Sequence, residues 1–390
     1  MSKLSSSIQV KEKNIGIELL RIISMLMIVL LHVTRQTFDF WTADKSSVNM
    51  FLTLYINSCS MPSVNCFAMI SGYVMLFSTV RYSRLIYLWF QVIFYSLGIW
   101  IFFHFFLKID THLFGIFFRP ITRNCWWYIS AYFGLFPFIP LINKSICAAS
   151  DKELYKWLCA ILFFFSLLPA IAHNRDVFGL LHGFSVVWLM CCYIIGASLR
   201  KILDNLKLDL LKKIQNAVPF LLIILLSAIA ALTAIRCFTP IGSQPHLLLL
   251  YDSYLSPFIV IYSVLLLIFF SGIKVTTTYC KKTINFFSPL TFGVYLIHTH
   301  PLVWKRIFED NVKIHISTQF LPVLLFKIFT YSLIIFFVCA LFDYIRKNIF
   351  DWLGVESLCK KIISIVEKLS IFFIKSFINS FTKSSFGNNS

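Results

Sequence analysis

Long runs of apolar residues recur along this chain of 390 residues, and each has about the length of a membrane-spanning helix. The runs at 220–234 and 255–270 are continuous and do not alternate between polar and apolar residues. A transmembrane β-strand needs about ten alternating residues, whereas a helix needs about 20 apolar residues to cross the bilayer. Charged residues make up 13% of the chain, against about 25% in soluble domains. The sequence therefore predicts an all-α, polytopic transmembrane helical bundle.

Apolar windows divide the chain into about ten predicted spans. We place them at 15–35, 51–77, 84–107, 126–146, 154–172, 182–199, 217–236, 254–272, 285–304 and 319–343. The first run contains an arginine and ends without a small-residue cleavage site, so we expect it to stay as the first helix rather than to be a signal peptide. The predicted domains are an N-terminal segment 1–14, a membrane core 15–345 and a tail 346–390.

The placement of basic residues predicts the orientation. The net charge of +18 is spread over short links between apolar runs, so we expect no nucleic acid partner. With a cytoplasmic N-terminus, the inner links and the tail carry most of the Lys and Arg residues, which predicts N-in/C-in topology. Apolar residues at helical spacing between lysines predict that the tail is an amphipathic helix on the inner leaflet: Ile362, Ile365, Val366, Leu369 and Phe373.

The first predicted span carries three ionisable residues, Glu18, Arg21 and His32. Eleven positions at about 100° each bring His32 within about 20° of Arg21, so both lie on one face of the helix, about 16 Å apart. Glu18 precedes Arg21 by three residues and can pair with it. A neutral histidine can act as a general base. The alternative is that Glu18 and Arg21 extend to the interface while His32 caps the outer end.

Two arginines three residues apart, Arg81 and Arg84, occupy the short link between the second and third spans. Guanidinium groups match phosphate geometry, so this arginine pair is a candidate for holding a phosphate-bearing ligand. The alternative is the ordinary positive charge of a cytoplasmic link.

Polar and aromatic residues at the ends of other spans are further candidates for lining the site. Ser71 and Tyr73 close the second span, and Trp127 and Tyr128 start the fourth span shortly after Arg123. Aromatic and arginine side chains together form a platform for a sugar, although an aromatic belt at the interface explains the same pattern.

The ninth span holds Tyr295 and His298, which are three residues apart and can share a face. The sequence leaves two interpretations open: these side chains line a site, or they form hydrogen bonds to neighbouring helices. The 11 cysteines show no metal-ligand spacing, so we expect neither a metal site nor a disulfide framework.

Six motifs in order resemble the acyltransferase-3 family of integral membrane acyltransferases. They are IELLRIISMLMIVLLHV, MPSVNCFAMISGYVML, RYSR, WWYISAYFGLFPFIPLINK, HGFSVVWLMCCYIIGASLRK and FGVYLIHTHPL. Arg21 and His32 match the arginine and histidine that the first helix of the family carries with ten residues between them, and Arg81 and Arg84 match its arginine pair. The likeness runs from about residue 14 to residue 345 and agrees with the ten-helix core of the family.

The resemblance implies an O-acetyltransferase of the bacterial inner membrane. It would take an acetyl group from acetyl-CoA on the cytoplasmic side and transfer it to a hydroxyl of a surface polysaccharide or its lipid-linked precursor. Arg81 and Arg84 would hold the CoA phosphates, Arg21 would position the thioester, and His32 would be the base or the acyl carrier. No cofactor is expected beyond the acetyl-CoA donor, and the sequence does not predict an oligomeric state.

Two other classes of membrane protein fit the composition. A transporter or flippase explains intramembrane charge, but such folds usually contain internal repeats, and none is found. A polysaccharide polymerase is also rich in aromatic residues, but we expect it to carry a long outer loop.

Overall fold

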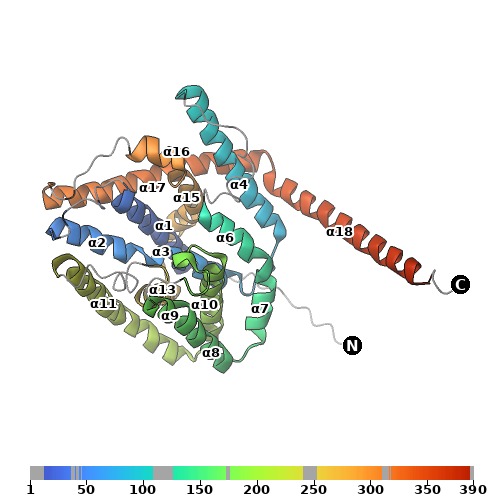
Figure 1. The fold of residues 1–390 in the computed structure, drawn as a ribbon, viewed down its shortest axis with the longest axis horizontal. Helices are drawn as coiled ribbons and strands as arrows, with labels where there is room; N and C mark the ends of the chain where they lie inside the picture. The colour runs from blue at the N-terminus through green and yellow to red at the C-terminus, as the bar shows by residue number, and fades with distance from the viewer. Residues whose placement is uncertain are drawn as a thin grey trace.

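The computed structural model describes residues 13–36, 46–108, 126–172, 176–239, 253–309 and 318–386, together with 40, 44 and 316; beyond Ser376 it describes only the backbone. Every regular element within these ranges is a helix (Figure 1). Among the described residues, seven helical segments are long and apolar enough to cross a membrane: Ile15–Arg35, Tyr82–Phe106, Trp127–Ala148, Asp151–Ile171, Val186–Asn205, Leu208–Phe238 and Leu321–Trp352. The all-α prediction is confirmed for the described residues, and the chain is a multi-pass membrane protein.

Each of these seven segments coincides with one predicted span. Three form from single helices, α1 (Ile15–Gln36), α10 (Val186–Asn205) and α17 (Leu321–Trp352). A fourth, α11 (Leu208–Phe238), contains Pro219 and is still one helix. The other three change helix type along their length: α4 (Tyr82–Ile101) with η1 (Phe102–Phe106); α6 (Trp127–Leu135), η2 (Phe136–Phe138) and α7 (Ile139–Ala148); α8 (Asp151–Leu162), η3 (Phe163–Leu167) and α9 (Leu168–Ile171).

The remaining three predicted spans fall on shorter helices. They are α2 (Val48–Ser60) with α3 (Pro62–Met75), α13 (Pro257–Gly272), and η6 (Ser288–Leu290) with α15 (Thr291–His298) and α16 (Pro301–Val303). Prolines stand in the first turn of α3, α13, η6 and α16, because proline has no N–H to donate and fits the first turn of a helix. The count of ten spans stays a prediction, since these helices are individually too short.

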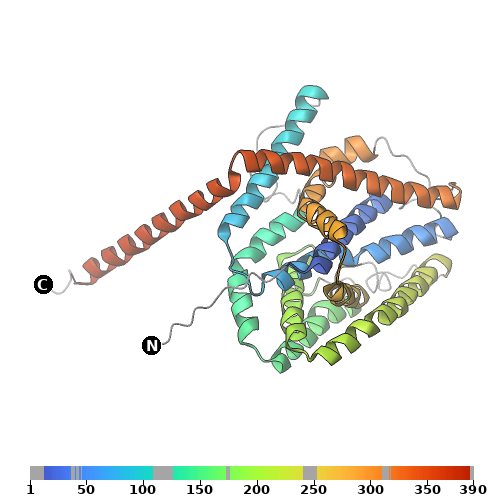
Figure 2. The same cartoon turned by 180° about the vertical axis from the view of Figure 1, so that it is seen from behind.

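Helix α1 lies in the interior of the bundle, with α17 along one side of it (Figures 1 and 2). It also contacts α2, α3, α13, α15 and α14 (Thr278–Phe287). Gly16 permits this at one crossing, because a Cβ there would overlap the carbonyl of Phe270. The helix that carries the candidate catalytic residues is therefore surrounded by helices from both halves of the chain.

Helices α3 and α10 approach each other closely because each places a glycine against the other's backbone. Gly72 faces the carbonyl of Tyr193, and Gly196 faces the carbonyl of Met69. Lipid tails are as apolar as leucine, so helices in a membrane gain stability from such close packing rather than from burial alone. Of the two helices, α3 lines the cavity described below, through Val64 and Phe67.

One end of the bundle gathers the start of α1 and the end of α13, where the Asn14 Nδ2 donates to the Ser271 carbonyl over 2.9 Å. The end of α17 meets the start of α4 on this side, where Arg346 Nη1 donates to the Tyr87 hydroxyl over 3.0 Å. Helix α17 runs through the predicted boundary at residue 345, so Arg346, assigned to the tail, is a buried residue of this helix. We call this side the α1-start end.

Candidate active site

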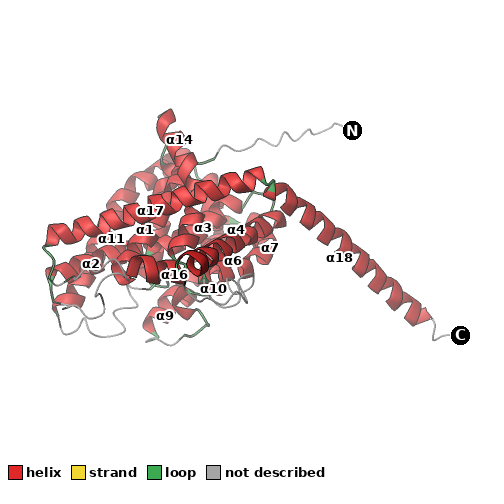
Figure 3. Ribbon diagram, turned by 90° about the horizontal axis from the view of Figure 1, so that it is seen from above, coloured by secondary structure: helices red, strands yellow, loops and turns green. Residues whose placement is uncertain are grey.

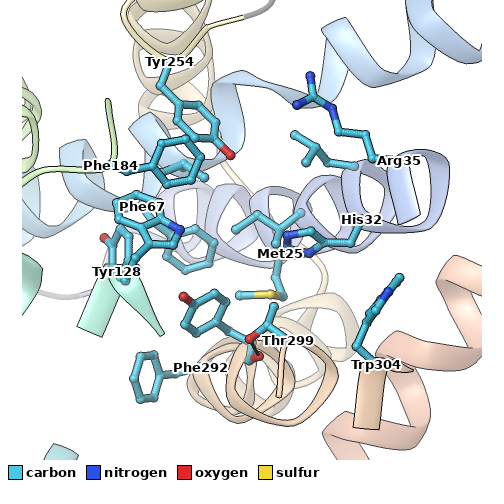
Figure 4. A pocket seen from close by; sticks show the side chains of 15 residues that line it. Met25, His32, Arg35, Phe67, Tyr128, Phe184, Tyr254, Phe292, Thr299 and Trp304 are labelled. Atoms are coloured by element: carbon cyan, nitrogen blue, oxygen red, sulfur yellow. Dashed lines mark hydrogen bonds between the residues drawn. The ribbon is translucent and has the colours of Figure 1, made fainter. Parts of the chain in front are cut away.

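A cavity of about 320 Å³ lies beside the last three turns of α1 (Figure 4). Its wall is largely aromatic and aliphatic, with a histidine, an arginine, tyrosines and a threonine as polar groups. The lining residues are Met25, Ile28, Leu31, His32, Arg35, Val64, Phe67, Trp127, Tyr128, Phe184, Tyr254, Phe292, Tyr295, Thr299 and Trp304. Apolar cavities with a few convergent polar groups are typical of ligand sites.

His32 and His298 form a hydrogen-bonded pair in the wall of this cavity. The His32 Nδ1 and His298 Nε2 atoms are 3.1 Å apart, and the His298 Nδ1 lies 2.6 Å from the Val294 carbonyl oxygen. A carbonyl only accepts, so the His298 Nδ1 carries a proton and donates it. In the neutral rings, His298 Nε2 then accepts from His32 Nδ1–H. This leaves a lone pair on His32 Nε2, which is the form that a general base or a nucleophile requires.

The backbone of α15 fixes this pair. His298 is fully buried at the end of the helix, and the carbonyl it donates to belongs to the preceding turn. The Trp304 ring lies 5.9 Å from the His32 ring and 6.4 Å from the His298 ring. Both imidazoles are thereby confined to one orientation, with His32 at the cavity and His298 behind it.

Three aromatic rings form a wall of the same cavity, and we call Trp127, Phe184 and Tyr254 the aromatic wall. The Trp127 ring centre lies 4.7 Å from that of Phe184 and 6.3 Å from that of Tyr254. Gly183, with φ 99°, allows the chain before α10 to pass Tyr254, because a Cβ at this position would overlap the tyrosine. Asn65 donates to the Tyr254 carbonyl over 2.8 Å and fixes it from behind.

Arg35 brings a positive charge into the cavity wall one turn after His32. Its Nε donates to the Asn57 Oδ1 over 2.9 Å. The Asn57 Nδ2 in turn donates to the Thr34 hydroxyl over 2.9 Å, which fixes the orientation of the amide. The sequence analysis did not single out Arg35, and its position three residues after His32 on the same helix was the available signal.

Arg21 and Glu18 lie further along α1, towards the α1-start end, and are not among the residues that line the cavity. Glu18 is buried, accepts a hydrogen bond from the Ser288 hydroxyl, and lies 3.6 Å from Arg21. The predicted pairing of Glu18 with Arg21 is therefore present. Arg21 acts electrostatically on Tyr128 and Tyr132, which stack at 6.5 Å on α6. Through Tyr128 this group adjoins the cavity.

The arginine pair is exposed at the start of α4. Arg84 acts electrostatically on Tyr132, as Arg21 does. Tyr128 and Tyr132 therefore extend along α6 from the cavity towards the pair. The structure brings Arg21, Arg84 and the two tyrosines into one neighbourhood, although they are far apart in the sequence.

The other predicted lining residues divide into two groups. Tyr128, Trp127 and Tyr295 line the cavity, and His298 adjoins it through His32. Ser71 and Tyr73 do not line it: Ser71 donates to the Phe67 carbonyl within α3, and Tyr73 lies beneath the Arg200 guanidinium, 4.8 Å away. Their proposed place in the lining has no support here, because both lie towards the other end of α3. Arg123 falls outside the described residues.

The sequence model of the acyltransferase-3 family, described as an acyltransferase domain, matches residues 14–346. The chain belongs to this family. No curated protein and no solved structure matches the chain. The resemblance inferred from the six motifs is therefore confirmed, and the protein is a membrane acyltransferase.

This acyltransferase also contains a buried charged network that the sequence analysis missed. Asp343 and Arg346 are both buried on α17, and the Arg346 Nε and Asp343 Oδ1 atoms are 2.8 Å apart. Tyr95 donates to the same Oδ1 over 2.6 Å, and Gln91 donates to it over 3.3 Å. Gly293 leaves room for the carboxylate beside α15. The network joins α4, α15 and α17, and so supports the helix that holds His298.

Proposed function

We propose that this acyltransferase moves an acetyl group from acetyl-CoA to a hydroxyl of a cell-surface polysaccharide or its lipid-linked precursor, in the bacterial inner membrane. The observation that supports this most is the hydrogen-bonded series from Val294 through His298 to His32 at the edge of a cavity. It supplies an oriented basic nitrogen where a hydroxyl can enter.

In the proposed reaction, the acceptor hydroxyl oxygen attacks the thioester carbonyl carbon while His32 Nε2 takes the hydroxyl proton. The resulting tetrahedral intermediate breaks its C–S bond, and the proton on His32 passes to the departing sulfur of CoA. The products are the acetyl ester and free CoA. Proton transfer by a positioned side chain contributes about 10²- to 10⁴-fold to such a rate.

A covalent route uses the same nitrogen. His32 Nε2 attacks the thioester carbonyl carbon and the C–S bond breaks, so CoA leaves as a thiolate that takes up a proton from water. The acceptor hydroxyl oxygen then attacks the acetyl-imidazole, the C–N bond breaks, and the hydroxyl proton passes to water. Rapid-quench mass spectrometry of the protein with acetyl-CoA and no acceptor distinguishes the routes. An acetyl group on His32 supports the carrier role. Its absence from a preparation that acetylates glycan once acceptor is added supports the base.

The donor and acceptor are assigned to opposite ends of the cavity. With the N-terminus and C-terminus inside, the α1-start end faces the cytoplasm, and the exposed arginine pair is available to the CoA phosphates there. Arg21 and the two tyrosines Tyr128 and Tyr132 lie between this end and His32. The aromatic wall offers flat rings on which a sugar can stack on the other side.

Transfer of radiolabel from acetyl-CoA to glycan tests the proposal. We expect labelled glycan with membranes containing the wild-type protein and none with His32→Ala, while both proteins insert equally by membrane fractionation. A transporter, flippase or polymerase would incorporate no label in either case. Full O-acetyl content in glycan from a His32→Ala strain, measured by NMR, would remove His32 from the reaction.

A further inference from the structure

Helix α18 (Val355–Phe386) leaves the bundle at the α1-start end and extends away from it (Figures 1 and 3). Its first turns are anchored. Val355 and Cys359 are buried against residues of α4, among them Tyr87 and Phe90. Gly354, with φ 63°, makes the turn from α17. The helix is thus tied to the bundle at one end only.

Beyond the anchor, α18 exposes a broad apolar face. Large apolar side chains from 46% to 67% exposed cover it: Leu358, Ile365, Val366, Leu369, Phe372 and Phe373. Soluble surfaces rarely expose so continuous an apolar patch, and such patches mark interaction sites. Something apolar must therefore cover this face in the working protein.

A regular row of lysines borders this face. Lys361, Lys368 and Lys375 are spaced by seven residues, and seven residues at 100° return to within about 20° of the same line. Glu356 and Glu367 lie on the opposite side of the polar face from this row. Lysine stems can follow an apolar surface while their ammonium groups reach out to charged groups beside it.

The pattern distinguishes a membrane from a second copy of the helix. Val355, Leu358, Ile362, Ile365, Leu369 and Phe372 follow a heptad, which a coiled coil also requires. A coiled coil, however, buries a narrow seam and pairs its flanking charges with opposite charges. Here Val366 and Phe373 widen the apolar face beyond a narrow seam. They also occupy positions at which a second helix would need acidic residues to pair with the lysine row. The face and its charge together match an anionic lipid surface.

We propose that α18 lies on the cytoplasmic leaflet, with its apolar face among the acyl chains and Lys361, Lys368 and Lys375 on anionic headgroups. This anionic-lipid contact is independent of the acyl-transfer chemistry proposed above. Because the first turns of α18 pack on α4, the lipid contact also holds α4, at whose start Arg81 and Arg84 lie. The lipid-binding helix therefore adjoins the proposed donor side of the enzyme.

The full-length protein in nanodiscs tests this proposal. A fluorescent non-natural residue is placed at 373, on the apolar face, or at 364, on the polar face, in discs of phosphatidylcholine with or without phosphatidylglycerol. With the anionic lipid we expect spin-labelled acyl chains to quench position 373 and aqueous iodide to quench position 364. Equal iodide quenching at both positions would overturn the proposal, as would energy transfer between copies through the labelled face.

The lysine row is tested by K361Q, K368Q and K375Q together. Since a basic residue near an anionic surface contributes about 1 kcal/mol, or roughly fivefold, the ratio of docked to undocked helix should fall about 100-fold. The matched control replaces Lys360, which lies outside the row and is ion-paired with Glu356 over 2.7 Å, and should leave the ratio within about fivefold. A single sharp peak in size-exclusion chromatography reports folding. The electrostatic contact would be refuted if the docked fraction stayed the same without phosphatidylglycerol and also after replacement of the three lysines.

Discussion

His298→Phe should slow acyl transfer without displacing the donor. The phenyl ring keeps the size of the side chain but removes the Nε2 that accepts from His32 Nδ1–H, 3.1 Å away. The His32 N–H is then buried without a partner, which costs about 1–3 kcal/mol. At about 1.4 kcal/mol for each factor of ten, kcat should fall about 5- to 150-fold. The fall in kcat reaches the upper end of this range if the His32 ring also adopts the tautomer that carries its proton on Nε2.

The matched variant is His298→Gln, whose side-chain oxygen keeps an acceptor for His32. We expect its kcat to lie between those of wild type and His298→Phe, with KM for acetyl-CoA unchanged in both. The assay is steady-state transfer of labelled acetyl to glycan, with thermal melting in detergent to show that each variant is folded. If His298→Phe retained kcat within twofold of wild type, or if the two variants lost the same activity, the inferred orientation of His32 would be wrong.

Three other substitutions test separate parts of the structure. Replacing both Arg81 and Arg84 by alanine should weaken acetyl-CoA binding about 10- to 100-fold in calorimetry, since each charged hydrogen bond contributes about 1.5–3 kcal/mol and not all are lost; unchanged affinity would exclude the pair from the donor site. Trp127→Leu should raise KM for the acceptor about 2- to 10-fold, from about 0.5–1.5 kcal/mol of aromatic contact, and an altered kcat alone would argue against a binding role. Asp343→Ala should destabilise the protein by about 3–5 kcal/mol in detergent unfolding, because it leaves a buried guanidinium unpaired. The exposed Glu356→Gln is its control and should change stability by less than about 1 kcal/mol; equal effects would contradict the buried network.

The sequence was informative where a property is local to one helix. The shared face of Arg21 and His32 follows from helical geometry, and so does the Glu18–Arg21 pair that the structure contains. The spacing of Tyr295 and His298 singled out the ninth span, and the structure places one in the cavity lining and the other in a hydrogen bond with His32. These predictions needed only the rotation of 100° per residue.

Features that depend on contacts between distant helices could not be read in this way. Nothing in the local pattern of Asp343 and Arg346 shows that Tyr95 completes their network from α4. Ser71 and Tyr73 look like site residues in sequence, but they lie at the opposite end of α3 from the cavity. The aromatic wall combines rings from three distant parts of the chain: Trp127 at the start of α6, Phe184 before α10 and Tyr254 before α13.

The partners of α1 also bear on the order in which the protein can assemble. Asn14 bonds to a residue 257 positions later, His32 to one 266 positions later and Glu18 to one 270 positions later. During synthesis the first helix therefore enters the membrane with its polar groups lacking these partners, a costly state in hydrocarbon. The late helices α13, η6 and α15 supply them, so a chain that stalls before residue 298 cannot complete the histidine pair. Assembly of the candidate active site is consequently one of the last events of biogenesis.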